Sequence, residues 1–284
     1  MRAIMILKKN ELMVDVTRAL QEDVGTGDVS AALLPENMQV NAKIISREPM
    51  LVCGKPWVEA VFAEINAAIK LDWLVDEGAW LNQPATLCRL EGPAAAILTA
   101  ERSALNFLQT LSATATETYH YVQAIKGTKA RLLDTRKTLP GLRMAQKYAV
   151  ACAGGTNHRM GLYDAFLIKE NHIKVCGSIA KAIQEARALN PKLFVEIEVE
   201  NLNELSEALE AKPDRILLDN FSETMLRDAV AMNQSYHCAL EASGGIRLTN
   251  IAAIARTGVD YISVGAITKS IQAIDLSLLI SRVQ

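Results

Sequence analysis

Short apolar runs separated by amphipathic segments fill the second half of the chain. From Ala130 on, the runs read ARLLD, AFLIK, LFVEIEV, DRILLD, CALEAS and YISVG. Between the later runs, apolar residues recur at helical spacing in IAKAIQEARAL, NELSEALEA, SETMLRDAV and TNIAAIART. Repeated strand-then-helix spacing predicts a parallel sheet covered by helices, which is either an α/β barrel or a doubly wound sheet.

The first half of the chain has a different pattern. An amphipathic helix is predicted from Glu11 to about Asp23, where glycines end the apolar spacing. Polar and apolar residues then alternate from Val40 to Glu48, as in a strand with one buried face. Further along, the sequence predicts a helix at 56–65 and strands at 70–75 and 85–90. These elements indicate a first domain of the α+β type.

A long helix is predicted to follow Gly92 and Pro93 and to continue as far as Gly127. Its apolar face contains Ile97, Leu98, Ala104, Leu105, Leu108 and Leu111. Arg102 follows Leu98 by four residues, which places a cation on or beside this stripe, where it needs a partner. An ion pair with Glu101 or another acid is the ordinary explanation, and a functional role is the alternative.

The composition limits the function classes. The chain has 284 residues, 50% of them hydrophobic and 22% charged, with a net charge of -2, which is typical of a globular protein. Near-neutral charge argues against a general nucleic-acid or membrane-surface binder. The five cysteines are scattered and the apolar run AIMIL is too short for a signal peptide. We therefore expect reduced, mostly buried thiols and a cytoplasmic protein.

The stretch from Asp134 to Ile173 is cationic. It has only three acids and contains two of the four histidines, His158 and His172, and six basic residues, Arg136, Lys137, Arg143, Lys147, Arg159 and Lys169. Its glycines allow the backbone to approach a ligand closely. A solvated basic loop is the ordinary interpretation. Because buried strand-like runs precede Arg136 and Lys169, we favour the wall of a pocket for a small polyanion.

Polar side chains lie at or just past the carboxyl end of nearly every predicted strand. They are Asp134 and Arg136, Lys169, Glu198, Asp219, Ser243 and Gly265. In a doubly wound sheet, only the strands beside a switch point would contribute to a site. Since α/β barrels place their sites at this end of all their strands, the pattern favours a barrel.

Acidic residues mark two of these strand ends. In VEIEVE, Glu196, Glu198 and Glu200 share one strand face, and Glu198 in the middle is the best candidate for a carboxylate bound to a metal or a hydroxyl. Glu196 or Glu200 at a frayed strand end in water is the ordinary alternative. Asp219 supplies a second acid for ribose hydroxyls or Mg²⁺, although Asp219 or Asn220 as a helix N-cap is nearly as good an interpretation.

Glycine loops follow the last two predicted strands, as Ser243-Gly244-Gly245 and Val264-Gly265. Loops at these places in barrels bind phosphate through backbone N–H groups, which glycine leaves accessible. His158 next to Arg159 also favours anion binding. Motifs for a hydrolase or a dinucleotide-binding fold are absent from the sequence.

Several motifs together resemble the quinolinate phosphoribosyltransferase family. They are DTRKTLPGLRMAQKYAV, GGTNHRMGLYDAFLIKENHI, VEIEVE, ILLDN and EASGGI, with EDVGTGDVS, REPMLVCG and AERSALNFLQ earlier in the chain. The resemblance implies an N-terminal α+β open-faced sandwich, residues 1–112 joined by 273–284. It also implies an incomplete α/β barrel of about seven parallel strands, residues 113–272.

The resemblance also implies a reaction and its residues. Quinolinate and phosphoribosyl pyrophosphate would give nicotinate mononucleotide, CO₂ and pyrophosphate with Mg²⁺, in a cytoplasmic homodimer. Lys137, Lys169, Glu198 and Asp219 would be catalytic, with Glu198 and Asp219 near the ribose hydroxyls and Mg²⁺. Quinolinate would contact Arg136, His158, Arg159, Lys169 and Arg102 of the neighbouring subunit. Lys137 would face the diphosphate, and the 5′-phosphate would lie against Ser243, Gly244, Gly245 and Gly265.

Two other functions remain open on the residues alone. Lys169 stands at a strand end, where barrel aldolases and decarboxylases place a lysine that forms a Schiff base. A barrel that only senses a nucleotide or another anion would bind it tightly without turnover.

Overall fold

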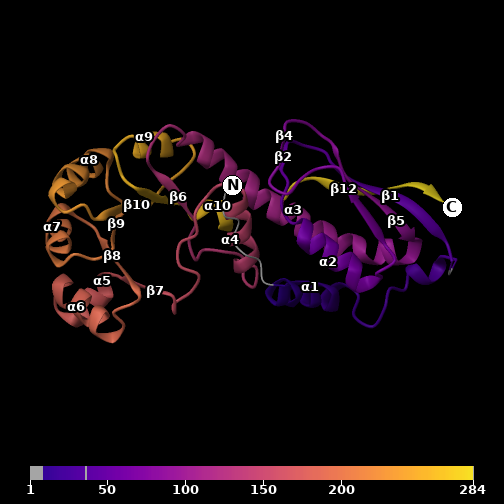
Figure 1. Cartoon of the computed structure of the whole chain (residues 1–284), viewed down its shortest axis with the longest axis horizontal. Helices are drawn as coiled ribbons and strands as arrows, with labels where there is room; N and C mark the ends of the chain where they lie inside the picture. The colour runs from indigo at the N-terminus through magenta and orange to yellow at the C-terminus, as the bar shows by residue number, and fades with distance from the viewer. Residues whose placement is uncertain (1–8, 36, 284) are drawn as a thin grey trace. The chain divides into compact units, whose positions relative to one another are not determined.

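The computed structural model describes residues 9–35 and 37–283 (Figure 1). The run AIMIL lies outside these residues. The chain forms two compact units. The first contains the chain as far as Tyr119, Leu139–Gly154 and the segment from Ser270 on, and the second contains His120–Thr138 and Gly155–Lys269. The expected boundary between residues 112 and 113 falls inside helix α3, Ala94–Ala124.

The first unit is built on an antiparallel sheet with the order β12-β1-β5-β3. Alternate side chains of β1 are buried, so one face of the sheet supports a core in which Trp57 and Phe62 are fully enclosed. The strand β12 pairs with β1 and so returns the end of the chain to this sheet. The strands are β1 Gln39–Ser46, β3 Lys70–Trp73, β5 Thr86–Pro93 and β12 Leu276–Val283, and a small separate sheet pairs β2 Met50–Leu51 with β4 Trp80–Leu81.

The predicted helices of the first half are confirmed within a residue or two at each end. They are α1 Lys9–Asp23 and α2 Lys55–Ile65, followed by α3. Pro56 lies in the first turn of α2, where the backbone N–H has no helical partner to lose. A short 3₁₀ helix covers Ala31–Leu33, and α4, Arg143–Cys152, also belongs to this unit.

Six parallel strands form the sheet of the second unit, in the order β6-β11-β10-β9-β8-β7. They are β6 Arg131–Leu133, β7 Ala165–Ile168, β8 Phe194–Val199, β9 Arg215–Asp219, β10 Ala239–Ser243 and β11 Tyr261–Ser263. All six match strands that the sequence predicts. Helices connect them, and the fold is the expected incomplete α/β barrel.

The strand count differs slightly from the expectation of about seven. Among the described residues, the sheet has six strands, and Thr156 adds one parallel bridge to Leu133 beside β6. Gly154 and Gly155 precede Thr156 and carry no side chain that packs, so this segment makes a bridge and not a strand.

Helices lie on the outside of the strands of this unit (Figure 1). Ser178, Asn201 and Ser222 cap three of them through side-chain oxygens that accept backbone N–H groups. Because Ser222 caps α8, the interpretation of Asp219 or Asn220 as its N-cap is wrong. The helices are α5 Glu170–Cys176, α6 Ile179–Leu189, α7 Leu202–Ala211, α8 Glu223–Met232, α9 Ile251–Ala255 and α10 Ala266–Lys269, with a 3₁₀ turn at Asn233–Ser235.

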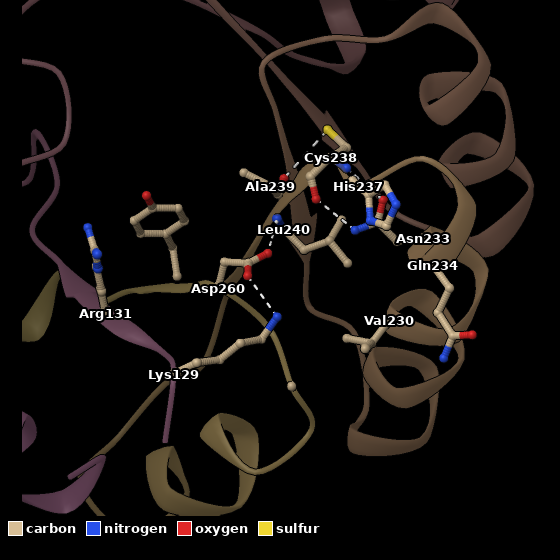
Figure 2. A pocket seen from close by; sticks show the side chains of 12 residues that line it. Lys129, Arg131, Val230, Asn233, Gln234, His237, Cys238, Ala239, Leu240 and Asp260 are labelled. Atoms are coloured by element: carbon tan, nitrogen blue, oxygen red, sulfur yellow. Dashed lines mark hydrogen bonds and ion pairs between the residues drawn. The ribbon is translucent and has the colours of Figure 1, made fainter. Parts of the chain in front are cut away.

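A cavity of about 540 Å³ lies at the amino ends of β6, β10 and β11 (Figure 2). Several of its polar groups are bound to one another: Lys129 Nζ lies 2.8 Å from Asp260 Oδ1, and the amide of Asn233 bonds both main-chain groups of Cys238. Burial raises the pKa of the Cys238 thiol to about 11, so this thiol is protonated at neutral pH. Such contacts are typical of the amino-terminal end of a barrel, whose residues stabilise the fold, while active sites lie at the other end.

Two further expectations concern cysteines and membranes. All five cysteines are free thiols, of which Cys53 and Cys88 are buried and the other three are half-buried. Within the part of the chain that the structure describes, every helix is too short or too polar to cross a lipid bilayer.

Candidate active site

A second cavity, of about 450 Å³, opens at the carboxyl ends of the barrel strands. Four of the six basic residues of the cationic stretch line it, whereas Arg143 and Lys147 lie on α4 in the first unit. The structure therefore brings together most of the side chains that the sequence singles out. The cavity is lined by Thr135, Arg136, Lys137, His158, Arg159, Leu167, Lys169, Glu198, Leu217, Asp219, Glu241, Ser243 and Ser263.

Asp134 fixes the loop that carries His158. It is fully buried at the end of β6 and accepts hydrogen bonds from the His158 backbone N–H at 2.8 Å and from the Asn157 amide at 2.6 Å. A buried carboxylate that receives N–H donors is stable in its charged form. Asp134 thus positions Asn157 and His158, and it is not among the residues that line the cavity.

Arg136 and Arg159 place two guanidinium groups in the same cavity. Burial lowers the pKa of Arg159, and the nearby charge of Arg136 lowers it further, although a guanidinium stays charged at neutral pH. Asp164 accepts the backbone N–H groups of Met160 and Gly161, which fixes the turn after Arg159. Two arginines that repel one another in a partly dry cavity form a site for an anion with two carboxylates.

Lys137 lies against the glycine of the last loop. A side chain at Gly265 would place its Cβ 3.1 Å from Cδ of Lys137, so glycine leaves room for the lysine. The hydroxyl of Thr268 donates to the Lys137 carbonyl at 2.7 Å and fixes the backbone below it. Lys137 and the Gly265 loop therefore lie next to each other in the structure.

Glu198 and Asp219 stand at the ends of the adjacent strands β8 and β9. Lys169 forms an ion pair with Glu198, and Asp219 Oδ2 accepts the Asn220 amide at 2.8 Å. We call Lys169, Glu198 and Asp219 the rim. The rim offers carboxylate oxygens to hydroxyl groups or a hard cation, and an ammonium group to an anion.

The loop after β10 depends on two glycines in the left-handed region. Gly244 has φ +90°, and a Cβ there would lie 2.1 Å from Oδ1 of Asn220. Gly245 has φ +60° with open space where a Cβ would point. The Asn220 backbone N–H donates to the Ser243 carbonyl at 2.9 Å, which joins this loop to the one after β9. Ser243 lines the cavity, and the loop keeps the form expected of a phosphate site.

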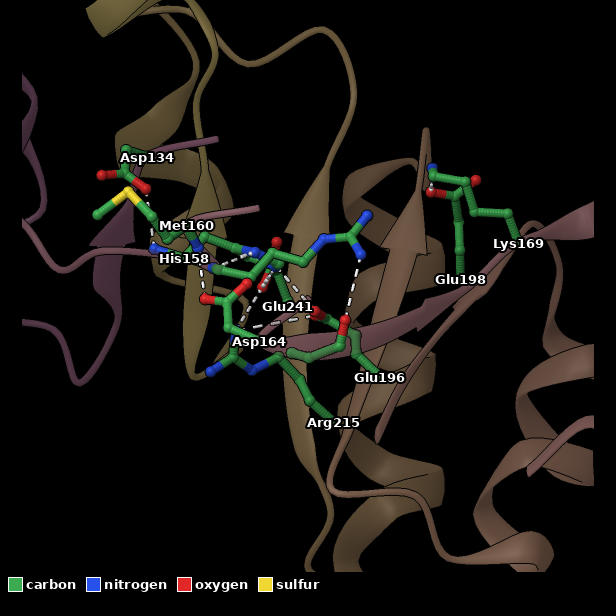
Figure 3. A network of polar contacts seen from close by, with 11 residues as sticks. Asp134, His158, Met160, Asp164, Lys169, Glu196, Glu198, Arg215 and Glu241 are labelled. Atoms are coloured by element: carbon green, nitrogen blue, oxygen red, sulfur yellow. Dashed lines mark hydrogen bonds and ion pairs between the residues drawn. The ribbon is translucent and has the colours of Figure 1, made fainter. Parts of the chain in front are cut away.

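Below the rim lie two buried acids, Glu196 and Glu241, beside the partly enclosed side chains of His158 and Arg215. We call these four residues the buried layer (Figure 3). His158 Nε2 lies 2.8 Å from Glu196, and Arg215 Nη1 lies 2.9 Å from Glu241. Glu196 is only 1% exposed, so its placement in water at a frayed strand end is wrong, while Glu200 is exposed.

Arg215 and Glu241 are site residues that the sequence interpretation missed. Glu241 interrupts the apolar run CALEAS as Glu196 interrupts LFVEIEV, and an acid in the middle of a buried strand is a usable signal. Arg215 is the first residue of its strand, where a charged residue is common and gives no signal of a site. In the structure, its guanidinium lies over the rings of Phe194 and Tyr261.

Comparison with known proteins agrees with this site. The family model described as quinolinate phosphoribosyl transferase, C-terminal domain, matches residues 114–279, and the one for the N-terminal domain matches residues 28–112. The chain belongs to the quinolinate phosphoribosyltransferase family. The two family domains meet within helix α3, near the boundary that the sequence suggests.

Members of the quinolinate phosphoribosyltransferase family are similar to the chain over nearly its whole length. The nicotinate-nucleotide pyrophosphorylase [carboxylating] of Mycobacterium leprae is 41% identical over 269 residues, which are 93% of this chain and 95% of the relative. A probable enzyme of the same name from Bacillus subtilis is 38% identical and covers 90% of this chain and 89% of its own. The solved nicotinate-nucleotide pyrophosphorylase of Francisella tularensis is 48% identical, with a TM-score of 0.93 and 98% of both chains covered.

The position of Arg102 on helix α3 can now be compared with the expectation from the sequence. It is exposed on α3, while the next three residues, Ser103, Ala104 and Leu105, are buried. Of the two expected positions, on or beside the apolar stripe, Arg102 takes the second, because the helix turns its side chain outward. Burial raises the pKa of the half-buried Glu101, and the charge of Arg102 partly opposes that shift.

Proposed function

We propose that the chain transfers the phosphoribosyl group of phosphoribosyl pyrophosphate to quinolinate with loss of CO₂. The products are nicotinate mononucleotide, CO₂ and pyrophosphate, in the de novo synthesis of NAD. The observation that carries this proposal is a single cavity in which Arg136, Arg159 and Lys169 meet two carboxylates at adjacent strand ends. The names of the M. leprae and F. tularensis relatives support the same reaction.

Quinolinate binds through its two carboxylates. Arg136 and Arg159 each offer a planar pair of N–H donors, which matches a carboxylate better than a lysine does. The dianion relieves the repulsion between the two guanidinium groups. Lys169 and His158 line the same cavity, and the Lys169 ammonium offers a third cation to the substrate.

The ring nitrogen of quinolinate attacks C1 of the ribose as pyrophosphate leaves. Glu198 and Asp219 face the ribose hydroxyls and stabilise the positive charge that develops on the sugar. Lys137 offsets the charge of the leaving diphosphate, while Ser243, Gly244, Gly245 and Gly265 hold the 5′-phosphate. The ribosylated ring nitrogen is cationic, so the bond to the C2 carboxylate breaks, CO₂ leaves, and the electron pair at C2 takes up a proton.

The rim fits Mg²⁺. This ion binds through one or two carboxylates together with substrate phosphates, and Glu198 and Asp219 offer such oxygens at neighbouring strand ends. When bound there with the co-substrate, Mg²⁺ would neutralise part of the diphosphate charge. Glu198 and Asp219 are the residues that would hold it.

The ion pair of Lys169 argues against the Schiff-base alternative. A lysine that attacks a carbonyl needs a free amine, whereas the side-chain nitrogen of Lys169 is engaged in an ion pair with Glu198. Borohydride in the presence of carbonyl substrates should therefore leave Lys169 unmodified. Stable mass addition at Lys169 would support an aldolase or decarboxylase.

We further propose a cytoplasmic homodimer in which Arg102 of the partner subunit completes each site. Exposure of Arg102 on α3 leaves it available for such a contact. Five free thiols are consistent with a reducing compartment.

One assay tests the reaction. Purified protein receives phosphoribosyl pyrophosphate, Mg²⁺ and carboxyl-labelled quinolinate, and released CO₂ and nicotinate mononucleotide are measured. We expect turnover of quinolinate and none of nicotinate, because loss of one carboxylate leaves a buried cation unpaired. Equal turnover of nicotinate would contradict the two-carboxylate site, and binding without any product would support the anion-sensor alternative.

A further inference from the structure

The buried layer contains more negative than positive charge. Glu196 on β8 and Glu241 on β10 lie on either side of β9, which carries Arg215. Glu196 is 1% exposed and Glu241 0%. One carboxylate oxygen of each lies within 4.8 Å of the other and of a ring nitrogen of His158. Two carboxylates this close in a dry environment repel one another even with Arg215 and Arg159 nearby, and this is costly unless a proton is held there.

His158 does not hold that proton. Its Nδ1 accepts the backbone N–H of Arg159 at 2.7 Å, and a backbone N–H can only donate. Nδ1 therefore carries no hydrogen. The other ring nitrogen, Nε2, donates its hydrogen to Glu196 at 2.8 Å. Since a charged imidazolium needs hydrogens on both nitrogens, His158 is neutral, and its tautomer is fixed by these two contacts.

Glu241 is the group whose surroundings favour the protonated form. Glu196 receives the hydrogen of His158, whereas Glu241 is completely enclosed and faces Glu196. Burial first, and then the charge of Glu196, raise the pKa of Glu241 to about 7, against the opposing effects of Ser263 and Arg215. Beyond these neighbours, the charged residues that line the cavity above Glu241 are Arg136, Lys137, Arg159, Lys169, Glu198 and Asp219.

We propose that Glu241 is protonated when quinolinate binds and that this proton determines the affinity of the site for its dicarboxylate substrate. Glu241 lines the floor of the cavity, so its ionisation places a negative charge beneath two incoming carboxylates. The affinity for quinolinate then falls as the pH rises above neutrality. This inference rests on the proposed function and adds to it a specificity-determining residue that acts through charge.

The first experiment compares KM for quinolinate at pH 6 and pH 8, a range in which both substrate carboxyl groups stay ionised. The ratio of the two KM values should be roughly three to ten in the unchanged protein, since deprotonation of one group near pH 7 limits binding. In Glu241→Gln, which copies the protonated form, the ratio should be close to one. Glu200→Gln is the matched control, because Glu200 ends the same strand as Glu196 but is exposed, and its ratio should stay high.

The outcomes of this comparison are distinct. If no CO₂ is released at any pH, the proposed function fails. If CO₂ is released and the KM ratio of Glu241→Gln equals that of the unchanged protein, the proposed function stands and the role of Glu241 is overturned.

A second experiment needs no variant. Calorimetric titration with quinolinate, in buffers of different ionisation enthalpy, measures the protons taken up on binding. We expect uptake that approaches one proton at pH 8 and is roughly one tenth or less at pH 6, because Glu241 must regain its proton only at the higher pH. Binding at pH 8 without proton uptake would overturn the proposal even if Glu241→Gln fails to fold.

Discussion

Glu196 and Glu198 lie two residues apart on one strand and behave differently. The Glu198 side chain is 15% exposed and pairs with Lys169, a long side chain that is itself 45% exposed. The Glu196 side chain is 2% exposed and pairs with His158, whose other ring nitrogen is also occupied. The rim therefore has partners that can move toward a substrate, while the partners of the buried layer are fixed. The position of a carboxylate along the strand therefore decides whether solvent and a ligand can reach it.

Glu77 in the first unit is a buried acid whose surroundings differ from those of Glu241. Burial raises its pKa, but the backbone N–H groups of Gly54 and Lys55 donate to it at 2.8 and 3.1 Å and oppose the shift. Tyr148 donates a further hydrogen bond at 3.1 Å. Glu77 thus stabilises the start of α2. Glu241 differs because another acid faces it.

The largest expected effect is the loss of activity when a cation is removed from the proposed substrate site above the buried layer. Arg102→Ala and Lys137→Ala should each be nearly inactive, because each removes a cation from every site of the proposed dimer. When equal amounts are dissociated, mixed and reassociated, half of the dimers are hybrids with one intact site. Activity should return to roughly a quarter of the unchanged level. If mass spectrometry confirms exchange and the mixture stays inactive, Arg102 does not act across subunits.

Arg136→Lys tests the geometry of substrate binding above the buried layer. A single ammonium cannot reproduce a two-pronged contact, so we expect a loss of about 2–5 kcal/mol in transition-state stabilisation, measured from kcat/KM. The pH dependence of KM should persist in this variant, since Glu241 is unchanged. A kcat/KM near that of the unchanged protein would mean that Arg136 does not hold a carboxylate.

The buried layer should also affect stability in a way that the rim does not. The pKa of Glu241 is raised from 4.5 to about 7. The folded state then binds more protons than the unfolded state between these values, so the free energy of unfolding falls as the pH rises through this window. The fall attributable to Glu241 is on the order of 3 kcal/mol at most.

Denaturant unfolding of Glu241→Gln and Glu198→Gln between pH 5 and 8 measures this difference. Glu241→Gln should lose most of the fall, whereas Glu198→Gln should keep it. The same pH profile in both variants would remove the distinction between the rim and the buried layer.

The smallest expected effect separates two adjacent glycines beside the rim. Gly245→Ala introduces only left-handed backbone strain, about 1–2 kcal/mol, because space is open there. Gly244→Ala adds a clash with Asn220, which should cost about 1–3 kcal/mol more in the free energy of unfolding. Equal destabilisation by both substitutions would mean that Asn220 can move away without cost.

The fold could be predicted from the sequence to a large extent, because its signals are local. Apolar runs and helical spacing identify all six barrel strands and the four helices α6 to α9, but not the short helices α5 and α10. The same local order places Lys169, Glu198, Asp219 and Ser243 at one end of a parallel sheet. The resemblance to the family supplied the reaction, which residue patterns by themselves left open between a transferase, a Schiff-base enzyme and a sensor.

The chain by itself determined which side chains stand at the strand ends, since each strand fixes the direction of its own residues. Only the tertiary structure decided which of them are enclosed. Arg215 and Glu241 are 26 residues apart in the sequence and meet because β9 and β10 pair. Arg102 faces outward because the neighbouring residues of its helix are the ones that pack. Burial arises when distant elements come together, and it changes the free energy of a charge more than any local pattern does.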